Sequence, residues 1–228
     1  MCAGFVYLLI LNQDTSKKKS AASYKININY MGLRTETKRF AVKVLSPMET
    51  YKPVKEKMPA NILEVKSAWK GLELVIEDIL DRFDVKRNKC IEFGTEFCYS
   101  TVVFSNFFKE VKGIDLFTGD PHAGFNEDHY ETTKKSVAEY KNIQLIQSDY
   151  RDYIKKDNEQ YDFAHVDIIH TYKETYECGL WAAKHSKCCI FHDTVSHPAV
   201  WRAVFKVAKE TGKKAYNYPF YHGLGIVV

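Results

Sequence analysis

The sequence contains no hydrophobic run long enough to cross a bilayer. Its apolar run from Gly4 to Leu11 is far shorter than the roughly 20 residues that a membrane-spanning helix needs. The run also lacks the basic region and the small-residue cleavage site of a secretory signal. We therefore predict no membrane span, and we expect a β-strand at this place.

The sequence also lacks C-x-x-C motifs and a large excess of charge of one sign. The six cysteines form no C-x-x-C pair, which removes the commonest zinc and redox motifs. Cys90, Cys188 and Cys189 fall in apolar runs, where a free thiol behaves as a small hydrophobe. This pattern predicts a reduced, cytoplasmic protein. The 33 basic residues are offset by 29 acidic ones, so the formal net charge is only +4, and we expect no nucleic-acid partner.

The 228 residues suffice for one α/β domain and a small appendage. Residues 1–46 alternate in the manner of short strands, with Phe40 to Val44 as the last of them. Residues 46–59 contain three prolines and are expected to form a linker. We therefore predict a β-rich extension and linker over 1–60 and a main domain over 61–228. The extension could cover the active site, mediate homo-oligomerisation or extend the main sheet.

The main domain begins with a periodic segment. Apolar residues recur at spacings of three and four from Ile62 to Phe83, which predicts a long amphipathic helix. From Cys90 onward, runs of strand length alternate with helical patterns, which indicates a parallel sheet covered on both faces. The last two runs are separated by a connection too short for a crossover and must pair antiparallel. Strands are expected at 90–93, 111–116, 143–147, 161–167, 187–191, 214–218 and 224–228, and helices at about 99–109, 128–140, 149–155, 172–185 and 198–211.

The segment from Lys89 to Leu116 combines a strand, a short loop, a helix and a second strand. The first strand is followed by Gly94, and the second ends in Asp115, 23 residues after Glu92. A spacing of roughly 20 residues is typical between a nucleotide-binding loop and the acid that grips ribose hydroxyls. The loop has one glycine and the additional acid Glu96, so it disfavours a pyrophosphate. A ribose ligand that carries positive charge and no phosphate fits this loop.

The loop and the C-terminal hairpin resemble those of the class I S-adenosylmethionine-dependent methyltransferases. The small O-methyltransferase branch, methyltransferase family 24, has an E-x-G-T-x-x-G-x-S-T loop, in which Cys98 replaces the last glycine here. The resemblance covers residues 67–228. It implies an α/β, Rossmann-like fold with a seven-stranded, mostly parallel sheet and a C-terminal antiparallel hairpin, and it implies S-adenosylmethionine as the cofactor.

The resemblance also assigns residues to cofactor binding. In this scheme Glu92, Gly94 and Thr95 hold the methionine part, Asp115 holds the ribose and Asp149 accepts from the adenine amine. Asp149 precedes a helix, so it also fits an N-cap, and both roles are open. The full set that the resemblance assigns to the cofactor is Glu92, Gly94, Thr95, Ser100, Asp115, Ser148, Asp149 and Asp167.

Two motifs that follow neighbouring strands predict the catalytic centre. A D-x-x-H-x-Y pattern begins at Asp167 and contains His170, and an F-H-D string supplies His192 and Asp193. Asp167, His192 and Asp193 are expected to converge and to form a divalent-metal set. Magnesium serves related enzymes, whereas two oxygens and one nitrogen suit manganese, iron or zinc better. In the metal-free alternative, His192 or His170 is the general base and Asp193 orients it.

Three further residues are candidates for the acceptor site. His122 and Phe125 lie in a polar insertion over 117–130 that resembles one in sugar methyltransferases, although a plain surface loop is the alternative. His222 lies in the last hairpin. The histidines placed at the same edge of the sheet are His122, His170, His192, His197 and His222, with His129, His165 and His185 expected elsewhere.

These features predict an S-adenosylmethionine-dependent methyltransferase that acts on a hydroxylated small molecule or a sugar or glycan precursor. A metal-dependent hydroxylase-like enzyme or a nucleotide-cofactor enzyme on the same fold is the first alternative. A non-catalytic binding protein is the second, because Cys98 and Ile168 depart from the pattern of the family. The partner expected in each enzymatic case is a small molecule.

Overall fold

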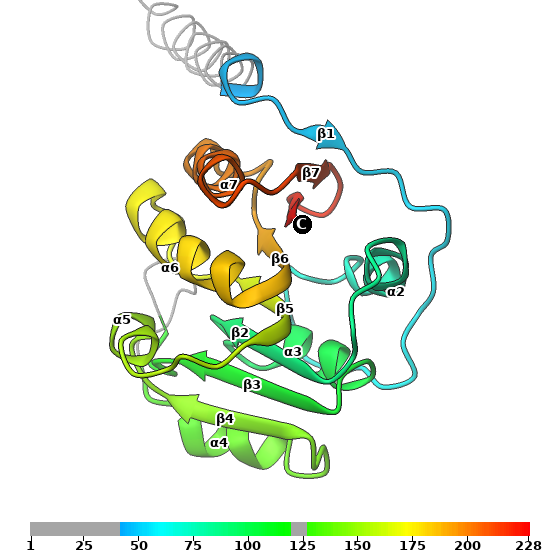
Figure 1. The fold of residues 1–228 in the computed structure, drawn as a ribbon. Coiled ribbons are helices and arrows are strands. Elements are labelled where there is room, and N and C mark those ends of the chain that lie inside the picture. The colour runs from blue at the N-terminus through cyan, green and yellow to red at the C-terminus, as the bar shows by residue number, and fades with distance from the viewer. Residues whose placement is uncertain (1–41, 120–126) are drawn as a thin grey trace, which may run out of the picture. The chain divides into compact units, whose positions relative to one another are not determined.

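The computed structural model of the chain describes residues 42–119 and 127–228, which form a sheet with helices on both faces (Figure 1). The strands expected before residue 41, and the candidate acceptor residues His122 and Phe125, lie outside the described residues. Their roles stay predictions. In the described part of the chain, no helix is both long and apolar enough to cross a membrane.

The sheet has the order β1-β7-β8-β6-β5-β2-β3-β4. Among the described residues, only β8 is antiparallel to its neighbours, β6 and β7, and the other pairs are parallel. This confirms the predicted mostly parallel sheet with a C-terminal antiparallel hairpin, and β1 brings the number of strands in the described part of the chain to eight. The strands are β1 (Glu49–Thr50), β2 (Lys89–Phe93), β3 (Glu110–Asp115), β4 (Ile143–Gln147), β5 (Tyr161–Val166), β6 (Ser186–His192), β7 (Ala215–Tyr218) and β8 (Leu224–Val227).

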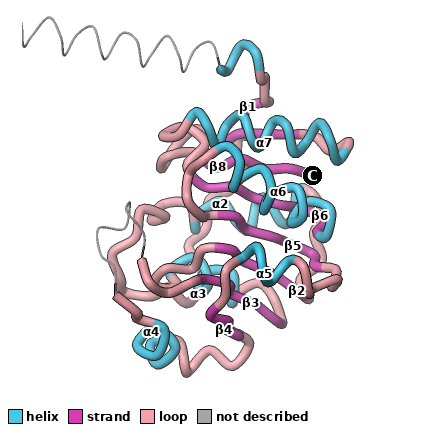
Figure 2. The backbone as a smooth tube through the Cα atoms, turned by 90° about the vertical axis from the view of Figure 1, so that its left-hand side faces the viewer, coloured by secondary structure: helices cyan, strands magenta, loops and turns pink. Residues whose placement is uncertain are grey.

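Helices cover both faces of the sheet (Figures 1 and 2). Along β2, Cys90 packs with the residues of α2 and α3, whereas Ile91 and Phe93 pack with those of α6 and α7. Side chains of a strand alternate between its two faces, so a run covered on both sides is apolar nearly throughout. The helices are α2 (Glu73–Arg82), α3 (Tyr99–Ser105), α4 (Tyr130–Ser136), α5 (Tyr150–Ile154), α6 (Tyr172–His185) and α7 (Pro198–Thr211).

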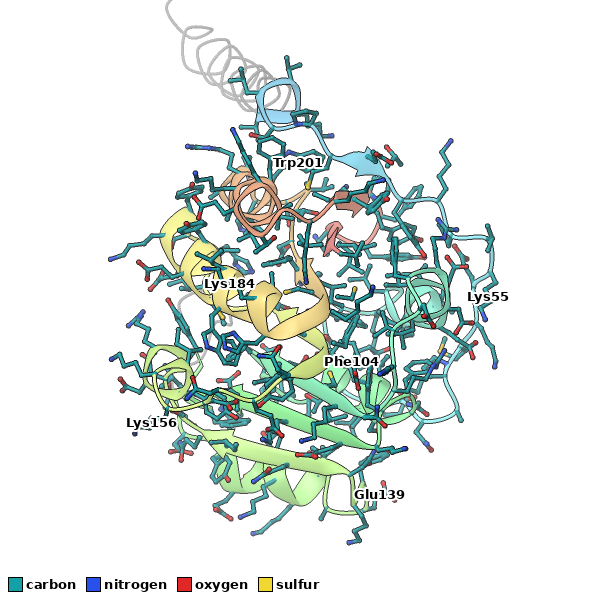
Figure 3. All side chains as sticks on the ribbon, in the orientation of Figure 1. Lys55, Phe104, Glu139, Lys156, Lys184 and Trp201 are labelled. Carbon is teal, nitrogen blue, oxygen red and sulfur yellow. The ribbon has the colours of Figure 1, made fainter. Side chains whose placement is uncertain are left out.

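Aromatic side chains fill the core on the side of α2 and α3. Phe104 is fully buried and makes edge contacts with Trp69 and Phe163, at ring-centroid distances of 5.4 and 5.5 Å. Figure 3 shows Phe104 inside the fold, whereas Lys55 and Lys156 lie at the edge of the molecule. The five cysteines of the described residues are buried and free, as expected of small hydrophobes.

The long helix expected from Ile62 begins only at Glu73, so this part of the prediction is wrong. Gly71 has a φ of +103°, outside the helical region, and the position of a Cβ there is filled by the ring of Tyr221. Ile62 and Val65 still pack against the core, but from an irregular segment. Apolar residues at spacings of three and four are therefore buried here without forming a helix.

The segment before this helix also differs from expectation. Residues 42–45, expected to end a strand, are helical. The expected linker, 46–59, contains β1 and packs against the sheet. Tyr51 is 2% exposed, and its hydroxyl donates to Asp78 at 2.5 Å. The division of the chain at residue 60 stays a prediction, because residues 1–41 lie outside the described part.

An ion-pair network near the starts of β2 and β5 makes stability depend on pH. Glu159 accepts from the ammonium groups of Lys112 and Lys89, which lower the pKa of Glu159 to about 2. Because this pKa lies below its unfolded value of about 4.3, the ionised carboxylate stabilises the fold above pH of about 4.3 and this contribution disappears as the pH falls toward 2.

We therefore expect Glu159→Gln to lower the free energy of unfolding at pH 7 by about 1–2 kcal/mol, allowing for solvent screening. The loss should shrink steadily between pH 5 and pH 2, because the wild-type carboxylate becomes protonated over this range. Urea unfolding of both proteins at several pH values measures this loss. Asp152→Asn, which removes an exposed carboxylate on α5, is the control. An equal loss for Glu159→Gln at every pH would contradict the prediction.

Candidate active site

A cavity of about 400 Å³ opens at the carboxyl ends of the central strands. The order of the sheet reverses between β2 and β5, and ligands of open α/β sheets bind at such a reversal. The predicted site residues that line this cavity are Gly94, Thr95, Ser100, Asp115, Ser148, Asp149, Asp167, His170, His192 and Asp193. The structure thus brings both predicted groups, the cofactor residues and the carboxylate–histidine group, into one space.

The loop after β2 is pressed against the end of β5. Gly94 has a φ of +85°, and a Cβ built on it would lie 1.8 Å from the carbonyl oxygen of Asp167. The amide of Asp167 donates to the carbonyl of Phe93 at 2.8 Å, and the amide of Gly94 donates to that of Ile114 at 2.9 Å. These bonds hold the loop between its two neighbouring strands, so only glycine fits at this position.

Asp115 organises the same loop through its side chain. One carboxylate oxygen accepts from the amides of Thr95 and Glu96 at 2.8 and 2.9 Å, and the other accepts from the amide of Phe117 at 2.7 Å. A carboxylate has about four lone-pair sites, so one is left for a ligand hydroxyl. Asp115 lines the cavity, in agreement with the position expected of a ribose-binding acid.

Glu92 lies below the cavity and is not among its lining residues in the described part of the chain. Its carboxylate is fully buried and accepts from the hydroxyls of Ser100 and Thr101 and from Nδ1 of His165 at 2.8 Å. The indole of Trp69 donates to Nε2 of His165 at 3.2 Å. Because an indole can only donate, Nε2 carries no proton and Nδ1 is the protonated nitrogen. Glu92 therefore supports the loop from beneath, and the structure does not place it against a ligand.

Asp149 caps α5 and stands at the rim of the cavity. Its carboxylate accepts from the amide of Arg151 at 2.8 Å, which confirms the predicted N-cap. The guanidinium of Arg151 also contacts Glu174 of α6 at 2.6 Å. Arg151 and Glu174 both line the cavity, but nothing in the sequence marked them as site residues.

The predicted catalytic residues form a compact group. Nδ1 of His192 lies 3.0 Å from Oδ2 of Asp167 and 3.3 Å from Oδ2 of Asp193. Nε2 of His170 lies 2.9 Å from Oδ2 of Asp193 and 3.5 Å from Oδ1 of Asp167. We call these four residues the DHHD cluster. A carboxylate at the end of a buried strand is costly unless it is paired, and this geometry gives Asp167 two imidazole partners.

Mutual attraction within the DHHD cluster outweighs the effect of burial on its ionisation. Burial alone would raise the pKa of Asp167, but the imidazoles of His192 and His170 hold it well below its usual range. Burial opposes protonation of His170, yet Asp167 and Asp193 raise the pKa of His170 to about 10. Burial likewise opposes protonation of His192, whose pKa is raised by Asp167, and the pKa of Asp193 is lowered by His170. A protonated His170 thus balances part of the charge of the two carboxylates.

The buried polar atoms of the site fit a ligand that the protein itself does not supply. Nε2 of His192 is buried without a hydrogen-bond partner among the described residues, as is the hydroxyl of Thr95. Both residues line the cavity. One oxygen or nitrogen from each of Asp167, His192 and Asp193 lies within 4.8 Å of the others, which is the donor set predicted for a divalent metal.

Other residues lie where the sequence did not predict them. His129 lines the cavity, although it was expected elsewhere. His222 is exposed and outside the lining, with its ring centroid 6.2 Å from that of His192. The irregular segment from Lys66 to Trp69 forms one wall of the cavity.

Comparisons with known proteins agree with this geometry. The sequence profile of methyltransferase family 24, described as a methyltransferase domain, matches residues 91–194. None of the curated proteins matches the sequence significantly. Among solved structures, the fold is similar to an O-methyltransferase from Bacillus cereus in complex with SAH, with 14% identity, a TM-score of 0.51, and coverage of 75% of this chain and 84% of the other.

A second similar structure is the O-methyltransferase TomG from Streptomyces achromogenes, involved in tomaymycin synthesis, in complex with SAM. It has 16% identity and a TM-score of 0.50, with coverage of 73% of this chain and 81% of that one. At such identities the likeness concerns the fold. Strand order and cavity define a class I methyltransferase fold. The profile match identifies residues 91–194 as a methyltransferase domain, and the fold agrees with that of S-adenosylmethionine-dependent methyltransferases.

Proposed function

We propose that the protein transfers the methyl group of S-adenosylmethionine to a hydroxyl oxygen of a small molecule or of a sugar or glycan precursor. The observation that carries this proposal is the single cavity that joins the cofactor residues to the DHHD cluster. Gly94 and Thr95 would accommodate the methionine part, with Ser100 beside them and Glu92 beneath. Asp115 would bind the ribose, and Ser148 and Asp149 the adenine. Two similar structures are O-methyltransferases in complex with SAH or SAM, which supports the choice of donor.

The transfer itself is an in-line displacement. The bond from sulfur to the methyl carbon breaks as the bond from the acceptor oxygen forms, and the hydroxyl loses its proton. Catalysis therefore needs alignment of donor and acceptor and a place for one proton. Asp167 lines the cavity between the loop of Gly94 and the rest of the DHHD cluster, so the acceptor hydroxyl would bind at the cluster.

Two roles of the DHHD cluster fit this reaction. In one, His192 takes the proton, since its Nε2 is buried and lacks a partner among the described residues, and Asp193 orients the ring. His170, with a pKa raised to about 10 by the two carboxylates, would keep its own proton at neutral pH. In the other, Asp167, His192 and Asp193 hold a divalent metal such as magnesium or manganese. A metal, when bound, would lower the pKa of the acceptor hydroxyl.

Titration calorimetry with S-adenosylhomocysteine tests the donor site. We expect one molecule to bind per chain, and Asp115→Asn to weaken binding at least tenfold, because the amide cannot accept from both the loop and a ribose hydroxyl. Asp152→Asn, on the exposed side of α5, should bind as the wild type does.

The alternatives give different results in the same titration. Absence of binding would overturn the proposal, and binding of NAD in its place would favour a nucleotide-cofactor enzyme. Binding without methylation of any acceptor in a screen of hydroxylated compounds would favour a non-catalytic protein. The oligomeric state of the chain follows from light scattering on the same samples.

A further inference from the structure

An ion-pair bridge joins α5 to α6 at the rim of the cavity. One guanidinium nitrogen of Arg151, on α5, lies 2.6 Å from Oε1 of Glu174 on α6, and another lies 3.3 Å from Oδ2 of Asp149. All three residues line the cavity. Arg151 therefore has two carboxylate partners, and its shorter contact is with Glu174.

Glu174 is held in place by the first turn of its own helix. The hydroxyl of Thr171 donates to Oε2 of Glu174 at 2.8 Å and accepts from the amide of Glu174 at 3.2 Å. A threonine followed three residues later by a glutamate is the sequence of a capping box. One carboxylate oxygen of Glu174 is thus bound to the cap, and the other faces Arg151. The cap presents this second oxygen to the guanidinium.

The two oxygens of Asp149 differ in how far they are occupied. Oδ1 accepts from the amide of Arg151 at 2.8 Å. Oδ2 has only the longer contact of 3.3 Å with the guanidinium. Hydrogen bonds between ionised groups are normally about 2.7–2.9 Å long, so the guanidinium holds Oδ2 weakly. Oδ2 is therefore the oxygen that can accept from the exocyclic amine of an adenine.

Glu174 and Asp149 compete for one guanidinium. An arginine side chain pairs with both oxygens of a single carboxylate when no other partner holds it. Without Glu174, we expect Arg151 to turn fully onto Asp149, the other carboxylate that it already contacts. Oδ2 would then be occupied, and the amine of the adenine would lose its acceptor.

We propose that Glu174 is a positioning residue that sets the purine specificity of the donor site by holding Arg151 away from Oδ2 of Asp149. This inference rests on the proposed function, which takes the adenine to bind at Asp149. A carboxylate can only accept a hydrogen bond, so the free Oδ2 selects a purine with a 6-amino group and repels one with a 6-oxo group. Glu174 acts on the donor through Arg151 and Asp149.

The test compares two ligands of the full chain by titration calorimetry. S-adenosylhomocysteine carries the 6-amino group, and S-inosylhomocysteine carries a 6-oxo group in its place. The wild type should prefer the adenosyl compound at least about tenfold, the effect expected of a hydrogen bond to a charged group. Glu174→Ala should reduce this preference to about threefold or less, because Arg151 then occupies Asp149.

A second substitution removes the competitor. Arg151→Met combined with Glu174→Ala should restore a preference of at least about tenfold, because no guanidinium remains to occupy Oδ2 of Asp149. Glu177→Ala is the matched control. It removes an exposed ion pair with Lys173 one turn further along α6 and should keep the preference of the wild type.

The ratio of the two affinities does not respond to a loss of stability, because both ligands bind the same folded fraction. An unchanged preference in Glu174→Ala, or a low preference that persists in the double variant, would overturn the inference. A wild type that binds both compounds equally tightly would also overturn it, while the proposed donor site would stand. Failure of the wild type to bind either compound would instead overturn the proposed function itself.

Discussion

Replacing Gly94 by alanine should abolish binding of S-adenosylhomocysteine, with a loss of affinity of at least a hundredfold. The added methyl group would lie 1.8 Å from the carbonyl oxygen of Asp167 and 2.6 Å from its carbonyl carbon. These are backbone atoms, so the clash cannot be relieved by rotating a side chain. Either the loop or the end of β5 must move, and each movement misplaces cavity-lining residues.

Gly212→Ala provides the matched control. Gly212 ends α7 with a φ of +68°, and no described heavy atom lies within 4 Å of its Cβ position. In this variant the free energy of unfolding should fall by only about 1 kcal/mol, because an alanine is strained in the left-handed conformation. Its affinity for S-adenosylhomocysteine should equal that of the wild type. Calorimetry and urea unfolding measure both effects. Wild-type affinity in Gly94→Ala would show that the loop does not need its close contact with Asp167.

Removing the imidazole of His165 should cost about 3 kcal/mol or more of unfolding free energy. His165→Leu leaves the buried carboxylate of Glu92 without one donor and the buried indole N–H of Trp69 without its acceptor. Each unsatisfied buried group costs about 1–3 kcal/mol. Because Ser100, which lines the cavity, also donates to Glu92, affinity for S-adenosylhomocysteine should fall as well.

Smaller changes in the same network separate its parts. Trp69→Phe keeps an aromatic ring but removes the indole donor and part of the buried ring, so it should cost about 2 kcal/mol. His185→Leu removes an imidazole that bonds one backbone carbonyl and should cost less than His165→Leu. Urea unfolding measures the loss of unfolding free energy in each of the three variants and so ranks them. Equal losses in His165→Leu and His185→Leu would show that the network beneath the loop contributes nothing of its own.

The sequence predicted the sheet well because its signals are local to each strand. Runs such as 90–93 and 187–191 are apolar on both faces, and the short final connection left antiparallel pairing as the only choice. Convergence of Asp167 with His192 and Asp193 followed from the adjacency of their strands. Pairing brings the carboxyl ends of neighbouring parallel strands together, so the motif positions were enough.

The errors have equally physical causes. Helical spacing from Ile62 onward could not reveal that Gly71 takes a left-handed conformation against Tyr221, 150 residues further along the chain. The position of Glu92 could have been found. Side chains alternate along a strand, and Ile91 packs on the face of α6 and α7, so Glu92 had to share the other face with Cys90. The roles of Arg151 and other rim residues depend on tertiary contacts that no local pattern carries.

The two-residue pairing of β1 with β7 protects the protein against unwanted assembly. Without β1, the outer side of β7 would present a row of free backbone donors and acceptors, which another chain could use as a template. Glu49 and Thr50 pair with Tyr216 and Asn217, and the amide of Tyr51 donates to the carbonyl of Asn217 at 2.8 Å. Among the described residues, the new outermost strand is only two residues long and is followed by the buried Tyr51. Aggregation through this edge is thereby discouraged at the cost of very few residues.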